Sequence, residues 1–184
     1  MKFYSVASLL SVASVAFSPI AQESPWVLGK DNAVTWSMGG DLGITEFDIQ
    51  LHNFNKSVMV GFLQLAQNVP VQKWASGSKK GQYGGELSVD LPQNMATGDG
   101  FSLIFMNTKS GNVYYKTPKF PIYAAASQPS NYSAPVLPSG TPATTAVITD
   151  MPNPTQQWGV TVGPAVATVT VADQAGHAGS GGSG

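Results

Sequence analysis

The sequence predicts an all-β protein: an antiparallel β-sandwich of about seven strands, followed by a disordered tail. Three observations support this prediction. Apolar and polar residues alternate over short segments between Gln22 and Tyr123, as in strands with one buried face. Glycine-containing turn sequences separate these segments, and no long segment has the 3.6-residue apolar period of an amphipathic helix. From Ala124 onward, Ser, Thr, Pro and Ala replace this pattern.

Residues 1–21 have the layout of a secretory signal peptide. Lys2 is the only charge, an apolar stretch follows it, and small residues lead to Ala21. We predict cleavage near Ala21, although Pro19 is unfavourable in the recognition site. The alternative is an uncleaved membrane anchor, but the run is short and diluted by Ala and Ser. No later stretch reaches the roughly 18 apolar residues of a transmembrane helix, so we expect a secreted chain.

Residues 22–123 contain the strand candidates of the predicted sandwich. In the clearest one, Phe47, Ile49 and Leu51 alternate with polar residues, which indicates one buried and one wet face. Several short, evenly spaced strands separated by turns are typical of an antiparallel sandwich. The seven candidates are Ala33–Ser37, Thr45–His52, Ser57–Ala66, Glu86–Leu91, Gly100–Met106, Asn112–Lys116 and Lys119–Tyr123.

Residues 124–184 are rich in Ser, Thr, Pro and Gly. Seven of the 13 prolines lie between Pro129 and Pro164. Proline removes a backbone donor and disfavours both helices and central strands. We therefore predict a disordered, O-glycosylated tail.

The composition excludes several classes of function. Nine Lys and ten Asp or Glu residues give a net charge of −1, so no strong field attracts nucleic acid or acidic membranes. The chain has no cysteine, which excludes disulfides, cysteine metal sites and cysteine nucleophiles. Its stability must come from a packed apolar core.

Four segments of the predicted sandwich resemble a known family: "VTWS", "FDIQLHN", "FLQLAQNVP" and "GDGFSLIFMNTKSGNVYYKTPKFPIY". In this order they resemble the fungal Ser/Thr-rich, often GPI-anchored secreted proteins. The amino-terminal domain of that family is similar to that of yeast cell-wall proteins of β-1,6-glucan synthesis. The resemblance covers Ser24 to Tyr123 and implies an immunoglobulin- or fibronectin-III-like sandwich at the cell wall. Its matching positions are core positions, so it implies fold more than function.

The carboxyl-terminal sequence departs from the GPI-anchored members of this family. A GPI signal needs small residues, a spacer and a hydrophobic tail. The ending "AGSGGSG" has no hydrophobic tail after it, and "GVTVGPAVATVTVA" lies upstream and is interrupted by Gly and Pro. The prediction is a freely secreted protein, or one whose given sequence stops before its tail.

Two sequons predict N-glycosylation in a secreted chain. They are centred on Asn55, followed by Lys56 and Ser57, and on Asn131, followed by Tyr132 and Ser133. A third asparagine, Asn153, is excluded because proline follows it.

No catalytic residue, metal site or cofactor is predicted. Glu46 and Asp48 lie on one face of a strand, separated by roughly 7 Å, which is in the range of inverting glycosidase carboxylates. A working pair needs a desolvated carboxyl, whereas alternation places both on the wet face. His52 and His177 belong to no cluster with metal-ligand spacing.

The aromatic residues suggest one candidate carbohydrate-binding site. Trp36 is expected in the core, and Trp26 at a sandwich end. Trp74 lies in a loop-like segment with lysines and Tyr83, where a ring could stack on a sugar. The alternative is a Trp74 side chain that folds back onto the sandwich edge. The predicted site consists of Trp74, Tyr83 and Tyr114.

These observations predict a non-enzymatic, secreted cell-wall protein with a structural or interaction role, either in β-glucan binding or in wall glucan assembly. Its expected partner is β-glucan or another wall protein. One alternative is an enzyme or accessory factor acting on wall polysaccharide; another is a secreted effector or adhesin. An aromatic patch favours sugar binding, a broad apolar patch favours a protein partner, and a concave site holding Glu46 and Asp48 favours catalysis.

Overall fold

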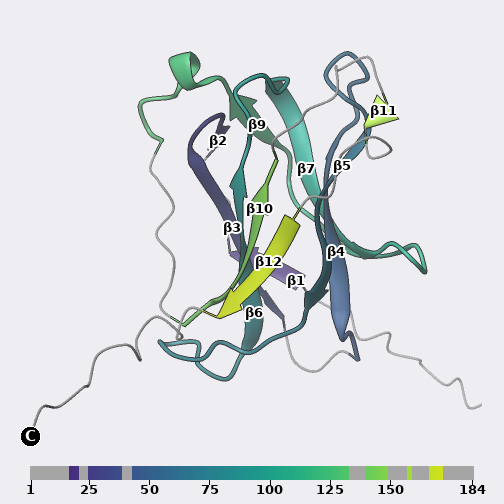
Figure 1. Cartoon of the computed structure of the whole chain (residues 1–184), viewed down its shortest axis with the longest axis vertical. Coiled ribbons are helices and arrows are strands. Elements are labelled where there is room, and N and C mark those ends of the chain that lie inside the picture. The colour runs from purple at the N-terminus through teal and green to yellow at the C-terminus, as the bar shows by residue number, and fades with distance from the viewer. Residues whose placement is uncertain are drawn as a thin grey trace, which may run out of the picture.

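The computed structural model describes residues 17–20, 25–38, 43–132, 140–148, 157–158 and 166–171 of the 184-residue chain. Within these ranges the chain forms strands and one short 3-10 helix, η1 (Ala125–Ser127). Figure 1 shows the strands in two layers that face each other. The predicted all-β sandwich is confirmed, and each of the seven predicted segments overlaps one strand, from β3 to β9.

The first sheet has the strand order β1-β3-β6-β10-β12. Its neighbours pair antiparallel, except that β10 runs parallel to β6. The strands are β1 (Phe17–Ile20), β3 (Asp31–Met38), β6 (Tyr83–Asp90), β10 (Pro142–Val147) and β12 (Val166–Val171).

The second sheet has the order β11-β5-β4-β7-β9-β2, and β8 also pairs with β7. Two of its pairs are parallel, β5 with β11 and β9 with β2. Parallel strands are joined by long connections rather than by hairpins. The alternation of residues within a single strand therefore did not predict these two pairings. The strands are β2 (Trp26–Val27), β4 (Glu46–Asn53), β5 (Val60–Pro70), β7 (Gly98–Asn107), β8 (Asn112–Lys116), β9 (Phe120–Tyr123) and β11 (Gln157–Trp158).

The structure differs from the prediction at β10, β11 and β12, which lie in the segment assigned to a disordered tail. Pro142 is the first residue of β10, a position where a strand tolerates proline. Thr144, Ala146 and Ile148 are buried in alternation, and the Ala75 N–H donates to the Gly140 carbonyl (2.8 Å), which anchors the start of the strand. The sandwich therefore extends beyond Tyr123, while residues 133–139, 149–156, 159–165 and 172–184 of the predicted tail lie outside the described residues.

An aromatic cluster joins the two sheets. Trp36 of β3 lies with its ring centroid 5.6 Å from that of Phe47 on β4 and 5.6 Å from that of Phe105 on β7. The Trp36 and Phe47 rings meet edge to face, a geometry that aromatic pairs favour. All three side chains are buried. As expected from the sequence, Trp36 is a core residue.

A second aromatic contact closes the sandwich near β2. Trp26 is buried and packs against Phe120 of β9, with ring centroids 5.1 Å apart. Asn32 holds the adjacent turn, because its Oδ1 accepts from the Val27 N–H (2.8 Å) and its Nδ2 donates to the carbonyls of Val27 and Lys30. This contact positions Phe120, which also lines the pocket described below.

We predict that Trp36→Ala lowers the free energy of unfolding by about 3–5 kcal/mol, because it removes the ring that joins the sheets and leaves a cavity. Denaturant-induced unfolding measures this loss. Val113→Ala is the control, since Val113 is 58% exposed and its truncation changes stability by less than about 0.5 kcal/mol. A loss below about 1 kcal/mol for Trp36→Ala would show that other contacts hold the sheets together.

Candidate functional site

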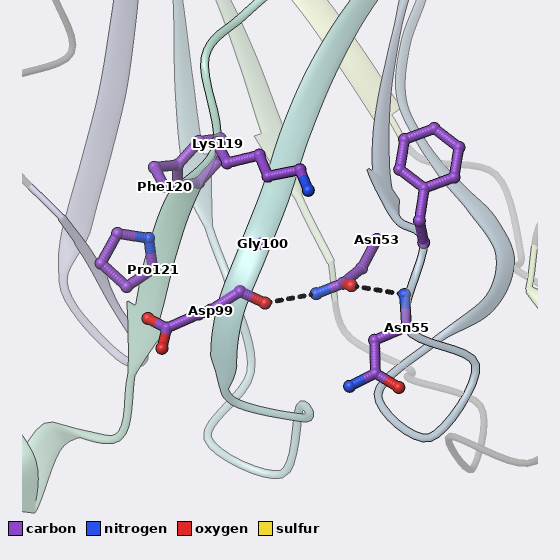
Figure 2. A pocket seen from close by; sticks show the side chains of 8 residues that line it. Asn53, Asn55, Asp99, Gly100, Lys119, Phe120 and Pro121 are labelled. Carbon is purple, nitrogen blue, oxygen red and sulfur yellow. Dashed lines mark hydrogen bonds between the residues drawn. The ribbon is translucent and has the colours of Figure 1, made fainter.

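A pocket of about 390 Å³ lies beside the end of β4, at the start of β7 and β9. Figure 2 shows most of its lining residues converging from these three segments. We call it the Phe54 pocket, after the exposed aromatic residue in its lining. It is lined by Asn53, Phe54, Asn55, Asp99, Gly100, Lys119, Phe120 and Pro121.

Asn53 connects the walls of the Phe54 pocket. Its Nδ2 donates to the Asp99 carbonyl (2.9 Å), and its Oδ1 accepts from the Asn55 N–H (2.9 Å), as the dashed lines in Figure 2 show. Gly100 has a positive φ of 87°, which glycine adopts without strain. The buried Asn53 amide therefore fixes the start of β7 relative to the turn after β4.

The pocket combines an exposed ring with polar and charged groups. Phe54 is 65% exposed, and the Lys116 Nζ lies 4.2 Å from its ring centroid. Asp99 and Lys119 add a carboxylate and an ammonium group to the lining. A sugar offers an apolar C–H face and many hydroxyls, which an aromatic ring and such donors and acceptors can bind.

The outer face of the sheet beside Phe54 carries a row of polar side chains. His52 stacks on Phe62, with ring centroids 5.5 Å apart, and its Nε2 lies 2.9 Å from the Gln50 Oε1. The Gln50 Nε2 donates to the Gln64 Oε1 (3.0 Å). Burial lowers the pKa of His52 and the charge of Lys116 lowers it further, so this ring is neutral at pH 7. His52 and Gln64 are half-buried and Gln50 is buried, so the row is an uncharged hydrogen-bonded network that is partly exposed at His52 and Gln64.

The two predicted N-glycosylation sites lie on exposed turns. The Asn55 Oδ1 accepts hydrogen bonds from the Ser57 N–H (3.0 Å) and the Ser57 hydroxyl (2.6 Å). Asn131 is exposed in a turn closed by a hydrogen bond from the Tyr132 N–H to the Pro129 carbonyl. Asn55 lies at the edge of the Phe54 pocket, a proximity that the sequence did not reveal.

Trp74 is not available for sugar stacking, so its predicted role is wrong. Its side chain is 3% exposed. The Trp74 N–H donates to the Gln82 carbonyl (2.9 Å) and the Gly81 N–H donates to the Trp74 carbonyl (2.8 Å), so the loop folds back on itself. A Cβ at Gly84 would lie 2.4 Å from the Trp74 Nε1, so the indole packs directly on that glycine. The alternative, a loop aromatic folded onto the sandwich edge, describes Trp74.

The other two aromatic residues of the predicted site lie on different sheets. Tyr83 begins β6 in the first sheet, and the Lys73 Nζ lies 4.9 Å from its ring centroid. Tyr114 is on β8 in the second sheet, partly buried against the core. Trp74, Tyr83 and Tyr114 therefore share neither a strand nor a loop, and the structure gives no single patch from them.

Asp48 binds β5 and the turn after β7 rather than facing solvent, which corrects its predicted position. It is 8% exposed. Its Oδ1 accepts from the Asn68 N–H (2.8 Å), and its Oδ2 accepts from the N–H (3.0 Å) and hydroxyl of Thr108. Asn68 has a positive φ of 51°, so Asp48 stabilises an unusual backbone conformation.

Glu46 is half-buried and pairs with the exposed Lys109, whose Nζ lies 3.3 Å from the Glu46 Oε1. The hollow that both Glu46 and Asp48 line has a volume of about 10 Å³. A single water needs roughly that volume, so a sugar ring does not fit between these carboxylates.

Comparisons with protein-family models, curated proteins and solved structures find no match to this chain. The function must therefore be argued from the geometry. Among residues whose placement is described, no group of three or more His, Cys, Asp or Glu side chains is arranged to hold a metal ion. Within the same residues, no helix is long and apolar enough to cross a membrane.

Glu86 is an unusual residue that the sequence analysis did not single out. It lies on β6 between Thr35 of β3 and Ala143 of β10, and is 0% exposed. Neither carboxyl oxygen has a hydrogen-bond partner among the described residues. Burial raises the pKa of Glu86 from 4.5 to about 7. The folded chain therefore holds this proton more tightly than the unfolded chain.

We predict that Glu86 makes stability depend on pH. The buried site favours the protonated carboxyl of Glu86. The free-energy cost of burying the ionised carboxyl is therefore absent below about pH 4.5 and grows as the pH rises through about 7. Glu86→Gln should raise the free energy of unfolding at pH 8 by about 1–3 kcal/mol and change it little at pH 4. Denaturant unfolding at both pH values measures this, with Glu46→Gln, a change at a half-buried carboxyl, as control. Equal effects of Glu86→Gln at both pH values would contradict the prediction.

Proposed function

We propose that this chain is a secreted, non-enzymatic sugar-binding protein of the cell wall, with β-glucan as the first candidate ligand and the Phe54 pocket as its site. The observation that carries the proposal is the exposed Phe54 ring at the edge of a pocket with amide, carboxylate and ammonium groups. The predicted secretion signal and the resemblance to fungal wall proteins support a ligand outside the cell.

The size and lining of the Phe54 pocket support a small-molecule or sugar-unit ligand. Its volume of about 390 Å³ falls within the roughly 300–1,000 Å³ typical of ligand sites. Lys116 lies over the Phe54 ring, and the side chain is still 65% exposed. This exposed part of the ring can contact a sugar. A longer polysaccharide chain could continue from Phe54 along the partly exposed side chains of His52 and Gln64.

The carboxylates support binding rather than hydrolysis. Glycoside hydrolysis usually needs two carboxyl groups on either side of the scissile bond. Asp99 is the one carboxylate in the lining of the Phe54 pocket. Asp48 is engaged by backbone and hydroxyl donors, and the hollow beside Glu46 is too small for a sugar. The alternative of a polysaccharide-cleaving enzyme therefore has less support than binding.

A protein-binding effector or adhesin also has less support. Such a function favours one broad apolar patch. Among the described residues, the exposed large apolar side chains are Phe54, Val113 and Val147, which belong to the turn after β4, to β8 and to β10. Of these three, Phe54 lines the Phe54 pocket.

We predict that Phe54→Ala weakens retention on insoluble β-glucan by roughly tenfold, equivalent to about 1.4 kcal/mol, because the sugar loses its stacking partner. The measurement is depletion of the secreted protein from solution by β-1,3/1,6-glucan, with chitin in parallel. Val113→Ala is the matched control, since it truncates an equally exposed apolar side chain outside the pocket. Asp99→Asn tests the polar part of the site.

Two results would overturn the proposed function. One is a wild-type protein that neither polymer retains. The other is equal retention of Phe54→Ala and Val113→Ala, which would move sugar binding away from the pocket. Trp74→Ala is a poor probe, because Trp74 is buried and its truncation lowers stability.

We predict an N-glycan on Asn55. Its Oδ1 is bound by Ser57 while its side chain is exposed, so the amide nitrogen is open to glycosyl transfer. Enzymatic deglycosylation should lower the mass of the wild type. In Asn55→Gln this mass shift should lack the contribution of the Asn55 glycan. Asn131→Gln tests the second sequon. If Asn55→Gln leaves the shift unchanged, this site is unmodified. Because Asn55 lies at the pocket edge, retention should be measured with and without its glycan.

A further inference from the structure

The first strand of the sandwich lies inside the segment that the sequence assigned to the signal peptide. β1 pairs antiparallel with β3, in a register that runs from Phe17 opposite Met38 to Ile20 opposite Thr35. It forms one edge of the first sheet. A protein that is cut after Ala21 would lose this strand.

The loss of β1 would leave part of β3 as a bare edge. The backbone groups of Thr35–Met38 that face β1 would then have no strand partner. Exposed edges of this kind promote pairing with other chains, and natural proteins cover or shorten them. A short strand that contains proline, as β1 contains Pro19, is one such protection, because proline is tolerated at sheet edges.

The sequence before Phe17 fits a cleavage site better than the sequence before Gln22. Signal peptidases recognise small residues three positions and one position before the cut. Ser14 and Ala16 occupy these positions for a cut before Phe17. A cut after Ala21 would put Pro19 at the first of them. The apolar stretch that ends at Ala16 has the length of a signal-peptide core.

We propose that the signal peptide ends at Ala16 and that β1 is the amino-terminal edge strand of the secreted protein. Hydrolysis of the Ala16–Phe17 peptide bond leaves the new carboxylate on Ala16 and the free α-amine on Phe17. The inference rests on the proposed secretion, and it moves the expected cleavage from Ala21 to Ala16. The processed chain then keeps all the strands that the structure describes.

Amino-terminal sequencing of the protein secreted by a eukaryotic host tests the cleavage. A sequence that begins Phe-Ser-Pro-Ile supports the proposal. A start at Gln22, or at any residue other than Phe17, overturns it while leaving secretion intact. A chain that stays in the cell and keeps Met1 overturns the secretion itself, so the two failures are distinguishable.

Hydrogen exchange tests the role of β1 as the edge strand. We compare chains that begin at Phe17 and at Gln22 and both end at Gly184. The β3 amides of Thr35–Met38 that face β1 should exchange at least about tenfold faster in the shorter chain. Amides of Ile49–Leu51 in β4 should exchange equally in both, which shows that the core is intact. Equal protection of the β3 amides in the two chains would overturn the role of β1.

Discussion

The packing of Trp36 against Phe47 and Phe105 is the contact on which the two sheets depend. The chain has no cysteine, so no disulfide joins them, and burial of these rings supplies that link. Phe47 lies near the start of β4, and Phe54 follows the end of the same strand. Because a strand is extended and stiff, the core contact also sets where Phe54 emerges. The aromatic ring proposed to bind sugar is thus held by an aromatic core.

Two buried carboxylates have opposite environments in this sandwich. Asp48 accepts three hydrogen bonds from Asn68 and Thr108 and organises the bulge in β5 and the turn after β7. Glu86 has no described partner and lies in the middle of a sheet, where burial favours its neutral form. A buried carboxyl group is therefore a hydrogen-bond acceptor at Asp48 and a group without a described partner, favoured in its neutral form, at Glu86.

Alternation predicted strands β3 to β9 because the side-chain period is a local property. β10 was missed, because its segment is rich in proline and its parallel partner β6 is distant in sequence. The burial of Trp74 could not be predicted either, because composition does not distinguish a loop that folds back onto the sandwich from one that extends into solvent. The sequence did indicate the position of Phe54, because Phe54 continues the alternating positions of Gln50 and His52 past the end of β4. The pocket itself depends on Asp99 and Lys119, which only tertiary structure brings close.

The position of β10 has a consequence for how the chain folds. Its contact with β6 joins Ala143 to Glu86, and such a non-local pairing requires closure of a long loop before it contributes stability. β6 cannot complete its pairing until residue 147 is available. The amino-terminal strands can assemble first, but β6 keeps an unpaired side until β10 has been synthesised. Folding should therefore be slower than in a sandwich built from hairpins alone, and this open side is the point at which a chaperone would protect the nascent chain.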